Sequence, residues 1–165
     1  MTPFILVELA HGRFLVGGWL FGAAATTDLL DGAVARKFGG ETKLGLYLDP
    51  IADKILLSSI YIGLAAGHAV PVWLVVVIFG RDLWISALSA IALRFTAFRD
   101  LNPSVWGKAS TFMQVMTAVA VMGGNGYRDL VLIRICDVLM WVVAALAVLS
   151  AGVYTNRGIA WLRTA

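Results

Sequence analysis

Residues 24–54 read AATTDLLDGAVARKFGGETKLGLYLDPIADK, and this stretch raises the question of why a largely apolar chain carries so many acidic residues here. The flanking sequence is typical of membrane helices, yet the stretch carries four aspartates: Asp28, Asp31, Asp49 and Asp53. A carboxylate at the centre of a membrane helix costs about 3 kcal/mol even on lenient insertion scales. We therefore expect these aspartates to share a partner that offsets this cost.

The composition is that of a polytopic membrane protein. Of 165 residues, 60% are hydrophobic and 14% are charged, and the mean hydropathy is +0.86. The length suits one domain over residues 1–165. The net charge of +3 comes without a basic run, which argues against nucleic acid as a partner. The single cysteine, Cys136, excludes an internal disulfide framework.

The order of apolar stretches predicts an all-α membrane bundle with five complete transmembrane helices. A helix of about 20 apolar residues can cross a bilayer, and five stretches meet this length: 14–30, 44–67, 70–95, 107–123 and 130–154. The segment TPFILVELA at residues 2–10 is apolar but about half as long. We interpret it as the end of a shortened first helix, so that the domain is short at its N-terminus.

The basic residues between the predicted spans set the orientation. Cytoplasmic loops carry an excess of Lys and Arg. One side has Arg13, Arg128 and Arg134. The other side has Arg36, Lys37, Lys43, Arg94, Arg99, Lys108, Arg157 and Arg163. This asymmetry predicts that the aspartate-rich segment faces the cytoplasm.

The spacing of the aspartates places them on two facing helices. Residues three or four apart share a helix face. The helix that begins at residue 14 carries Asp28, Asp31, Gly32, Ala35 and Arg36 on one side. The returning helix carries Gly45, Asp49 and Asp53 on one side. A short connection makes these helices antiparallel neighbours, and the small residues leave room for a ligand between them.

Carboxylates that converge in this way predict a metal site. Four close carboxylates cannot all stay ionised without compensation. Oxygen ligands without His or Cys favour Mg²⁺ or Mn²⁺, and two such ions form a device for displacement at phosphorus. The alternative is that the aspartates cap helix ends or pair with nearby Lys and Arg. For Asp49, which precedes Pro50, that alternative is evenly balanced with a metal ligand.

The same residues resemble the signature of the CDP-alcohol phosphatidyltransferase family, D-x-x-D-G-x-x-A-R-x8-G-x3-D-x3-D. The stretches RDLWIS from Arg81 and GKASTFMQ from Gly107 are similar to later segments of bacterial members. The resemblance implies a fold of six transmembrane helices, a homodimer, and an active site at the cytoplasmic face of a bacterial inner membrane. It also implies an enzyme of phospholipid biosynthesis that displaces CMP from a CDP-linked lipid, CDP-diacylglycerol, with an alcohol.

The resemblance also implies roles for single residues. Asp28, Asp31, Asp49 and Asp53 would bind two ions, Mg²⁺ or Mn²⁺, and Asp53 is the candidate catalytic base. Gly32, Ala35 and Gly45 would give the donor nucleotide clearance, although plain helix packing is the alternative. Arg36 would bind phosphate, or else only anchor the helix at the cytoplasmic side.

Arg81 and Lys108 are the candidate residues for binding the acceptor's phosphate. Arg81 and Asp82 lie midway along their predicted helix, where an arginine should face a polar cavity or the bundle interior. A structural ion pair is the alternative, with a different partner for each because sequence neighbours do not share a helix face. For Lys108 the alternative is an interfacial lysine whose amine reaches toward water.

The acceptor itself stays open between two alcohols. RDLWIS resembles phosphatidylglycerophosphate synthases, which implies glycerol 3-phosphate as the acceptor and phosphatidylglycerophosphate as the product. TDLLDG and LDPIADKILLS also resemble cardiolipin synthases, which implies phosphatidylglycerol as the acceptor. A divalent-cation channel or transporter would explain the aspartates, but it gives no role to Gly32, Ala35, Arg36 and Gly45. A non-catalytic membrane scaffold leaves the aspartates unexplained.

Overall fold

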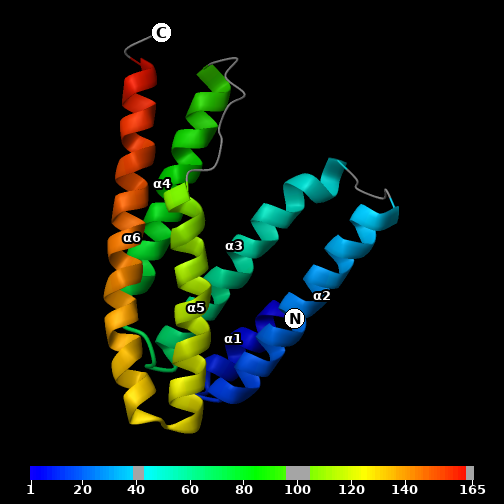
Figure 1. The fold of residues 1–165 in the computed structure, drawn as a ribbon, viewed down its shortest axis with the longest axis vertical. Coiled ribbons are helices and arrows are strands. Elements are labelled where there is room, and N and C mark those ends of the chain that lie inside the picture. The colour runs from blue at the N-terminus through cyan, green and yellow to red at the C-terminus, as the bar shows by residue number, and fades with distance from the viewer. Residues whose placement is uncertain (39–42, 96–104, 163–165) are drawn as a thin grey trace. The chain divides into compact units, whose positions relative to one another are not determined.

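The computed structural model describes residues 1–38, 43–95 and 105–162, and it describes side chains for residues 1–27, 30, 53–88 and 105–156. Within these ranges the chain forms helices and no strand (Figure 1). The helices are α1 (Thr2–Ala10), α2 (Phe14–Phe38), α3 (Lys43–Ala66), α4 (Val72–Phe95), α5 (Val105–Tyr127) and α6 (Leu130–Leu162). The predicted all-α class is confirmed, with a first helix of nine residues.

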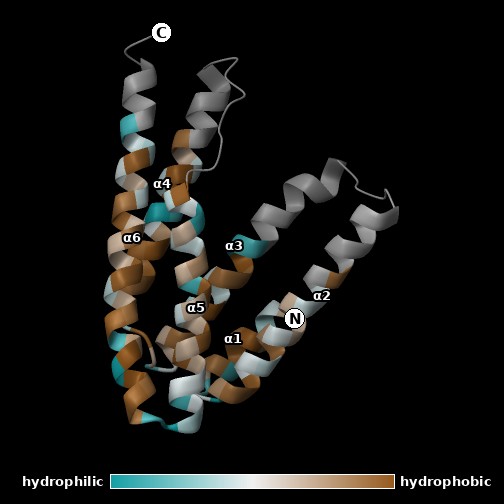
Figure 2. Cartoon of the chain, viewed as in Figure 1, coloured by the Kyte–Doolittle hydropathy of each residue, from teal (hydrophilic) through white to brown (hydrophobic). Residues whose placement is uncertain are grey.

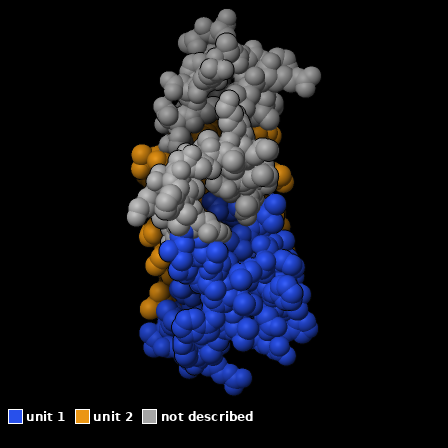
Figure 3. Space-filling view, turned by 90° about the vertical axis from the view of Figure 1, so that its right-hand side faces the viewer, with its two compact units in different colours: residues 1–71, 118–133 blue, residues 72–117, 134–165 orange. Residues whose placement is uncertain are grey.

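The chain divides into two compact units, which Figure 3 colours separately. Unit 1 consists of residues 1–71 and 118–133, and unit 2 consists of residues 72–117 and 134–165. The long helices α5 and α6 therefore each contribute to both units. The division reflects which parts of the backbone contact each other. The single domain expected from the sequence stays a prediction.

In unit 1, α1 packs tightly against both α2 and α3, and two glycines make this approach possible. A Cβ added to Gly17 of α2 would lie 2.8 Å from Leu9 Cγ. A Cβ added to Gly63 of α3 would lie 2.9 Å from Leu9 Cβ and 3.1 Å from the Leu6 carbonyl oxygen. Leu9 is fully buried there. Because its side chain meets both glycines, Gly17 of α2 and Gly63 of α3 lie at the same height along the helix pair.

The helices α1, α3 and α5 all end in the same hydrogen-bonding motif. A backbone N–H bonds to the carbonyl five residues earlier, at 2.9 Å for Arg13 to Glu8, 2.9 Å for Ala69 to Leu64 and 3.0 Å for Asp129 to Gly124. The preceding residues, Gly12, His68 and Arg128, have φ values of 74°, 59° and 56°. This is the Schellman arrangement, which satisfies the last carbonyl groups of a helix.

The helix α5 continues through the stretch GNGY, which the sequence suggested as part of a connection. Its last residue is Tyr127, four residues beyond the predicted end at Gly123. Gly126 allows the end of α5 to pack closely against α2, because a Cβ at this position would lie 2.6 Å from the side chain of Leu15. The Asn125 side chain donates a 2.9 Å hydrogen bond to the Val121 carbonyl, so its amide is satisfied within the helix.

In unit 2, α4 and α6 run parallel to each other. Trp73 stacks near Trp141 with ring centroids 4.8 Å apart, and Trp84 Nε1 donates a 2.8 Å hydrogen bond to Thr155 Oγ1. Residue numbers therefore rise together along both helices. A parallel pair is what two helices adopt when the chain crosses once between them, as α5 does here.

Hydrophobic residues make up most of the described helices, and hydrophilic ones lie at the short connections and at a few places within α3, α4 and α6 (Figure 2). One described stretch, Leu130–Asn156, is long and apolar enough to cross a membrane by itself. The described apolar part of α2, Phe14–Thr27, is shorter. The five transmembrane helices expected from the sequence therefore stay a prediction.

Candidate functional site

The eight residues of the signature lie on the two longest helices of unit 1. Asp28, Asp31, Gly32, Ala35 and Arg36 belong to α2, and Gly45, Asp49 and Asp53 belong to α3. The two helices are joined by residues 39–42, so Phe38 and Lys43 are at most about 18 Å apart. Helical backbone at all eight positions agrees with the face-sharing pattern predicted from their spacing.

The packing of α1 gives the register between α2 and α3. Gly17 and Gly63 flank the same side chain, Leu9, and so lie at one level. From Gly17, Asp28 is eleven residues further along α2, which is about 16 Å at the rise of a helix. From Gly63, Asp53 is ten residues back along α3, or about 15 Å.

Because α2 and α3 are antiparallel, these two distances run in the same direction, so Asp28 and Asp53 lie at nearly the same level. The same reasoning applies one turn further. Asp31 is fourteen residues beyond Gly17, and Asp49 is fourteen residues before Gly63. The four backbone positions therefore form two levels, each with one aspartate from either helix.

Asp53 is the one aspartate of the signature whose side chain lies in the described part of the chain, and it is exposed, as is Lys54. It continues the face of α3 that carries Ile60 and Leu64, which are fully buried. The described contacts of α1 with the glycines of α3 are at Gly63 and Gly67, ten residues or more from Asp53.

The other side chains of the signature lie outside the described residues: Asp28, Asp31, Gly32, Ala35, Arg36, Gly45 and Asp49. Among the side chains that the structure describes, no three His, Cys, Asp or Glu residues gather as metal ligands would. The metal centre stays a prediction, supported by the helix register and by the oxygen-only chemistry of the donor set.

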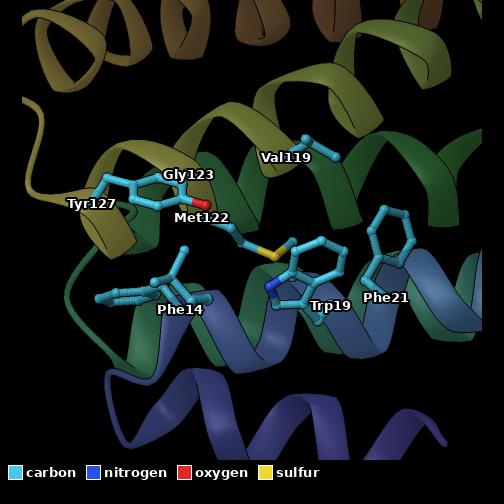
Figure 4. Close-up of a pocket in the computed structure, with 9 residues that line it drawn as sticks. Phe14, Trp19, Phe21, Val119, Met122, Gly123 and Tyr127 are labelled. Atoms are coloured by element: carbon cyan, nitrogen blue, oxygen red, sulfur yellow. The ribbon is translucent and has the colours of Figure 1, made fainter.

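A pocket of about 200 Å³ lies in unit 1 between α2 and the end of α5. In Figure 4, Phe14, Trp19 and Phe21 of α2 lie opposite Met122 and Tyr127 of α5. The walls are almost entirely apolar, and the α2 residues precede Asp28 by at least seven residues, or about two turns. Such a pocket has no groups suited to holding a diphosphate, so we separate it from the acidic site.

Arg81 and Asp82 pair with each other, which corrects the expectation that each finds another partner. Arg81 Nη1 lies 2.5 Å from Asp82 Oδ1, and the two side chains are 10% and 23% exposed. The two residues do not share a helix face, but the arginine side chain is long enough for its guanidinium to bend back toward its sequence neighbour. In apolar surroundings the closest opposite charge is favoured strongly enough to impose this.

Lys108, the second candidate for the acceptor's phosphate, is exposed near the start of α5. Neither a hydrogen bond nor an ion pair joins it to Arg81, and both side chains are among those described. The adjacent face of α5 is buried and polar, because Ser110, Gln114 and Thr117 are at most 2% exposed. The structure therefore places the two candidate cations in different surroundings.

Ser150 is a residue that the sequence did not single out. Its hydroxyl accepts a 2.8 Å hydrogen bond from Arg81 Nη2, and it is fully buried. In the sequence it is one small polar residue within the apolar run ALAVLSAGVY, which is common in ordinary helix packing. A contact across 69 residues is visible only in the folded chain.

Comparison with known proteins identifies the family. The sequence profile of CDP-alcohol phosphatidyltransferases matches residues 1–152. A relative from Bacillus subtilis (strain 168), named CDP-diacylglycerol--glycerol-3-phosphate 3-phosphatidyltransferase, is 32% identical over 96% of this chain and 79% of its own length.

Two further relatives match over a smaller part of their own length. A probable phosphatidylglycerophosphate synthase of Mycobacterium tuberculosis is 37% identical, covering 70% of this chain and 57% of the relative. A probable cardiolipin synthase (CMP-forming) of Drosophila melanogaster is also 37% identical, covering 74% and 43%. The chain belongs to the CDP-alcohol phosphatidyltransferase family and is an enzyme.

Proposed function

We propose that this enzyme transfers the phosphatidyl group of CDP-diacylglycerol to glycerol 3-phosphate, giving phosphatidylglycerophosphate and CMP. The observation that supports the donor half of this proposal is the approach of Leu9 to both Gly17 and Gly63, from which the backbone positions of the four aspartates are expected at two matching levels. The names of the Bacillus and Mycobacterium relatives support this choice of donor and acceptor.

The donor set fits a pair of hard divalent cations, since Asp28, Asp31, Asp49 and Asp53 offer only carboxylate oxygen. These four residues would hold two Mg²⁺ or Mn²⁺ ions. When bound, such ions supply charge stabilisation to a diphosphate undergoing displacement. The ion pairing that carboxylates otherwise need would then come from the ions and the substrate together.

The remaining residues of the signature bind and orient the donor. Gly32, Ala35 and Gly45 have no reactive side chain, and they leave space for the nucleotide against the helix backbones. Arg36 donates charge-assisted hydrogen bonds to a phosphate. Together they hold the donor so that its lipid phosphorus is open to an alcohol.

Asp53 acts as the general base of the reaction. It accepts the proton of the acceptor hydroxyl while that oxygen forms a bond to the lipid phosphorus and the bond to CMP breaks. The carboxylate is exposed, so an acceptor can reach it. Arg81 and Lys108 bind the phosphate of glycerol 3-phosphate.

The enzyme works in a membrane as a polytopic helical bundle. The span Leu130–Asn156 and the apolar character of the other helices support this. The distribution of basic residues supports an active site on the cytoplasmic side of a bacterial inner membrane. We extend the proposal to a homodimer, which is what the resemblance to the family implies.

Cardiolipin synthesis is the second candidate function. The relative named probable cardiolipin synthase (CMP-forming) favours it, with phosphatidylglycerol as the acceptor in that case. The two functions share the donor half of the reaction. They differ in whether the acceptor is a small phosphate ester or a second lipid.

The test is to supply the purified chain in detergent–lipid micelles with CDP-diacylglycerol, Mn²⁺ and one acceptor at a time. We expect CMP release and phosphatidylglycerophosphate with glycerol 3-phosphate. Cardiolipin formed from phosphatidylglycerol instead would establish the second candidate. Absence of CMP release with every alcohol, together with Mn²⁺ flux into liposomes that contain the chain, would refute both and favour a channel.

A further inference from the structure

A buried polar cluster joins α4 to α6 within unit 2. The Arg81 guanidinium contacts two groups: Nη1 pairs with Asp82 Oδ1 at 2.5 Å, and Nη2 donates to Ser150 Oγ at 2.8 Å. The arginine side chain is 10% exposed, and Ser150 is fully buried. Burying a charged guanidinium between two helices costs free energy, so the cluster calls for an explanation beyond packing.

One donor of this guanidinium is left over. Arg81 Nε is buried and has no hydrogen-bond partner among the residues that the structure describes. An unsatisfied donor on a charged buried group is costly, and native structures keep few of them. A donor that is held in place but unused is ready for an anion that arrives later.

The two existing contacts determine where that donor points. A guanidinium is a planar fork, so fixing its two terminal nitrogens fixes the plane and the direction of the Nε–H bond. Asp82 comes from the same helix as Arg81, and it moves with that helix. Ser150 comes from α6 and is therefore the contact that holds the fork in position relative to the second helix.

We propose that Ser150 is a positioning residue for the acceptor: it holds the Arg81 fork so that the Nε–H meets the phosphate of glycerol 3-phosphate. This inference rests on the proposed function, in which Arg81 binds that phosphate. Ser150 does not touch the acceptor. It acts through Arg81, and its loss therefore weakens acceptor binding more than it slows the transfer step.

A second hydrogen bond between the same helices provides a matched control. Trp84 Nε1 donates to Thr155 Oγ1 at 2.8 Å, which equals the Arg81–Ser150 distance. Thr155→Val removes this bond between α4 and α6 but leaves the Arg81 fork intact. If Ser150 only tied the two helices together, both variants would behave alike.

The experiment measures KM for glycerol 3-phosphate, KM for CDP-diacylglycerol, kcat and Tm for the full chain. We expect Ser150→Ala to raise KM for glycerol 3-phosphate about tenfold, the lower end for loss of a hydrogen bond to a charged group. Its kcat and its KM for the donor should stay within about twofold by the same reasoning. Ser150→Thr, which keeps the hydroxyl, should restore acceptor affinity.

Thr155→Val should lower Tm to a similar extent as Ser150→Ala and leave KM for glycerol 3-phosphate unchanged. Equal KM changes in these two variants, or no change in Ser150→Ala, would overturn the positioning role. Should Ser150→Ala fail to fold, Ser150→Cys keeps the volume with a weaker acceptor, and an unchanged acceptor KM there is equally decisive. Arg81→Lys separates the two proposals: an unchanged acceptor KM in that variant refutes Arg81 as the phosphate ligand, whatever Ser150 does.

Discussion

The indole rings of Trp73 and Trp141 lie with their centroids 4.8 Å apart and their planes inclined by 32°, which joins the start of α4 to α6. Aromatic pairs in such tilted arrangements contribute about 0.5–1.5 kcal/mol beyond the area they bury. We expect a double-mutant cycle with Trp73→Ala and Trp141→Ala to give a coupling in this range. Unfolding in mixed micelles measures it, and a coupling near zero would show that the rings pack independently.

A second prediction compares two glycines that differ only in what surrounds them. Gly63→Ala places a methyl group 2.9 Å from Leu9 Cβ and 3.1 Å from the Leu6 carbonyl oxygen, so α1 must shift. Gly22→Ala, within α2, meets nothing within 4 Å. Overpacking costs about 1–3 kcal/mol, while alanine in an open helix position gains about 0.5–1 kcal/mol. We therefore expect the free energy of unfolding to change in opposite directions.

The packing of α1 also predicts an effect of Gly63→Ala on turnover. Because Leu9 sets the register of α2 against α3, a shift of α1 should also misalign the aspartate levels and reduce turnover. Gly22→Ala should leave turnover unchanged. Full activity in a destabilised Gly63→Ala would separate the packing of α1 from the register of the acidic site.

A third prediction concerns the metal ions. Chelation should abolish CMP release, and added Mg²⁺ or Mn²⁺ should restore it. Asp28→Asn and Asp49→Asn, one on each helix, should each lose nearly all turnover while still inserting into the membrane, since each change removes a charged ligand from a shared centre. Near-normal activity in either variant would refute its assignment as a ligand.

A fourth prediction separates the base from the ligand at Asp53. Asp53→Asn keeps one ligating oxygen but loses the basicity that activates an alcohol. If Asp53 acts mainly as base, transfer should fall by about 10²–10⁴ while metal and CDP-lipid still bind. Metal affinity and single-turnover transfer are measured on the same sample. Weakened Mn²⁺ binding with substantial rescue at high Mn²⁺ would end the assignment as base.

The sequence alone predicted the helical path of the acidic site, because residues at three- and four-residue spacing share a helix face whatever the tertiary structure. Asp28 and Asp31 on α2, and Asp49 and Asp53 on α3, follow from spacing and a short connection. Their pairing into two levels did not. It depends on where Leu9 meets Gly17 and Gly63, which is a contact of side-chain shapes and leaves no periodic signal.

The surroundings of Arg81 show the opposite limit. Helix geometry argued that Arg81 and Asp82 face different directions, yet the flexible arginine side chain brings the two charges within 2.5 Å. Ser150 gave no signal because a single serine in an apolar helix is ordinary. Long side chains and contacts distant in sequence are thus where residue patterns stop being informative.

The pairing of Arg81 with its immediate neighbour has a consequence for biogenesis. A chain is synthesised from its N-terminus, so α4 must enter the proposed membrane before α6, and Ser150 with it, has been made. A lone arginine would then meet the translocation machinery without a counter-charge. Since Asp82 belongs to the same helical turn, the charge is compensated as soon as that turn exists. The helix can be handed to the lipid as a nearly neutral segment, and the bond to Ser150 then forms after α6 arrives.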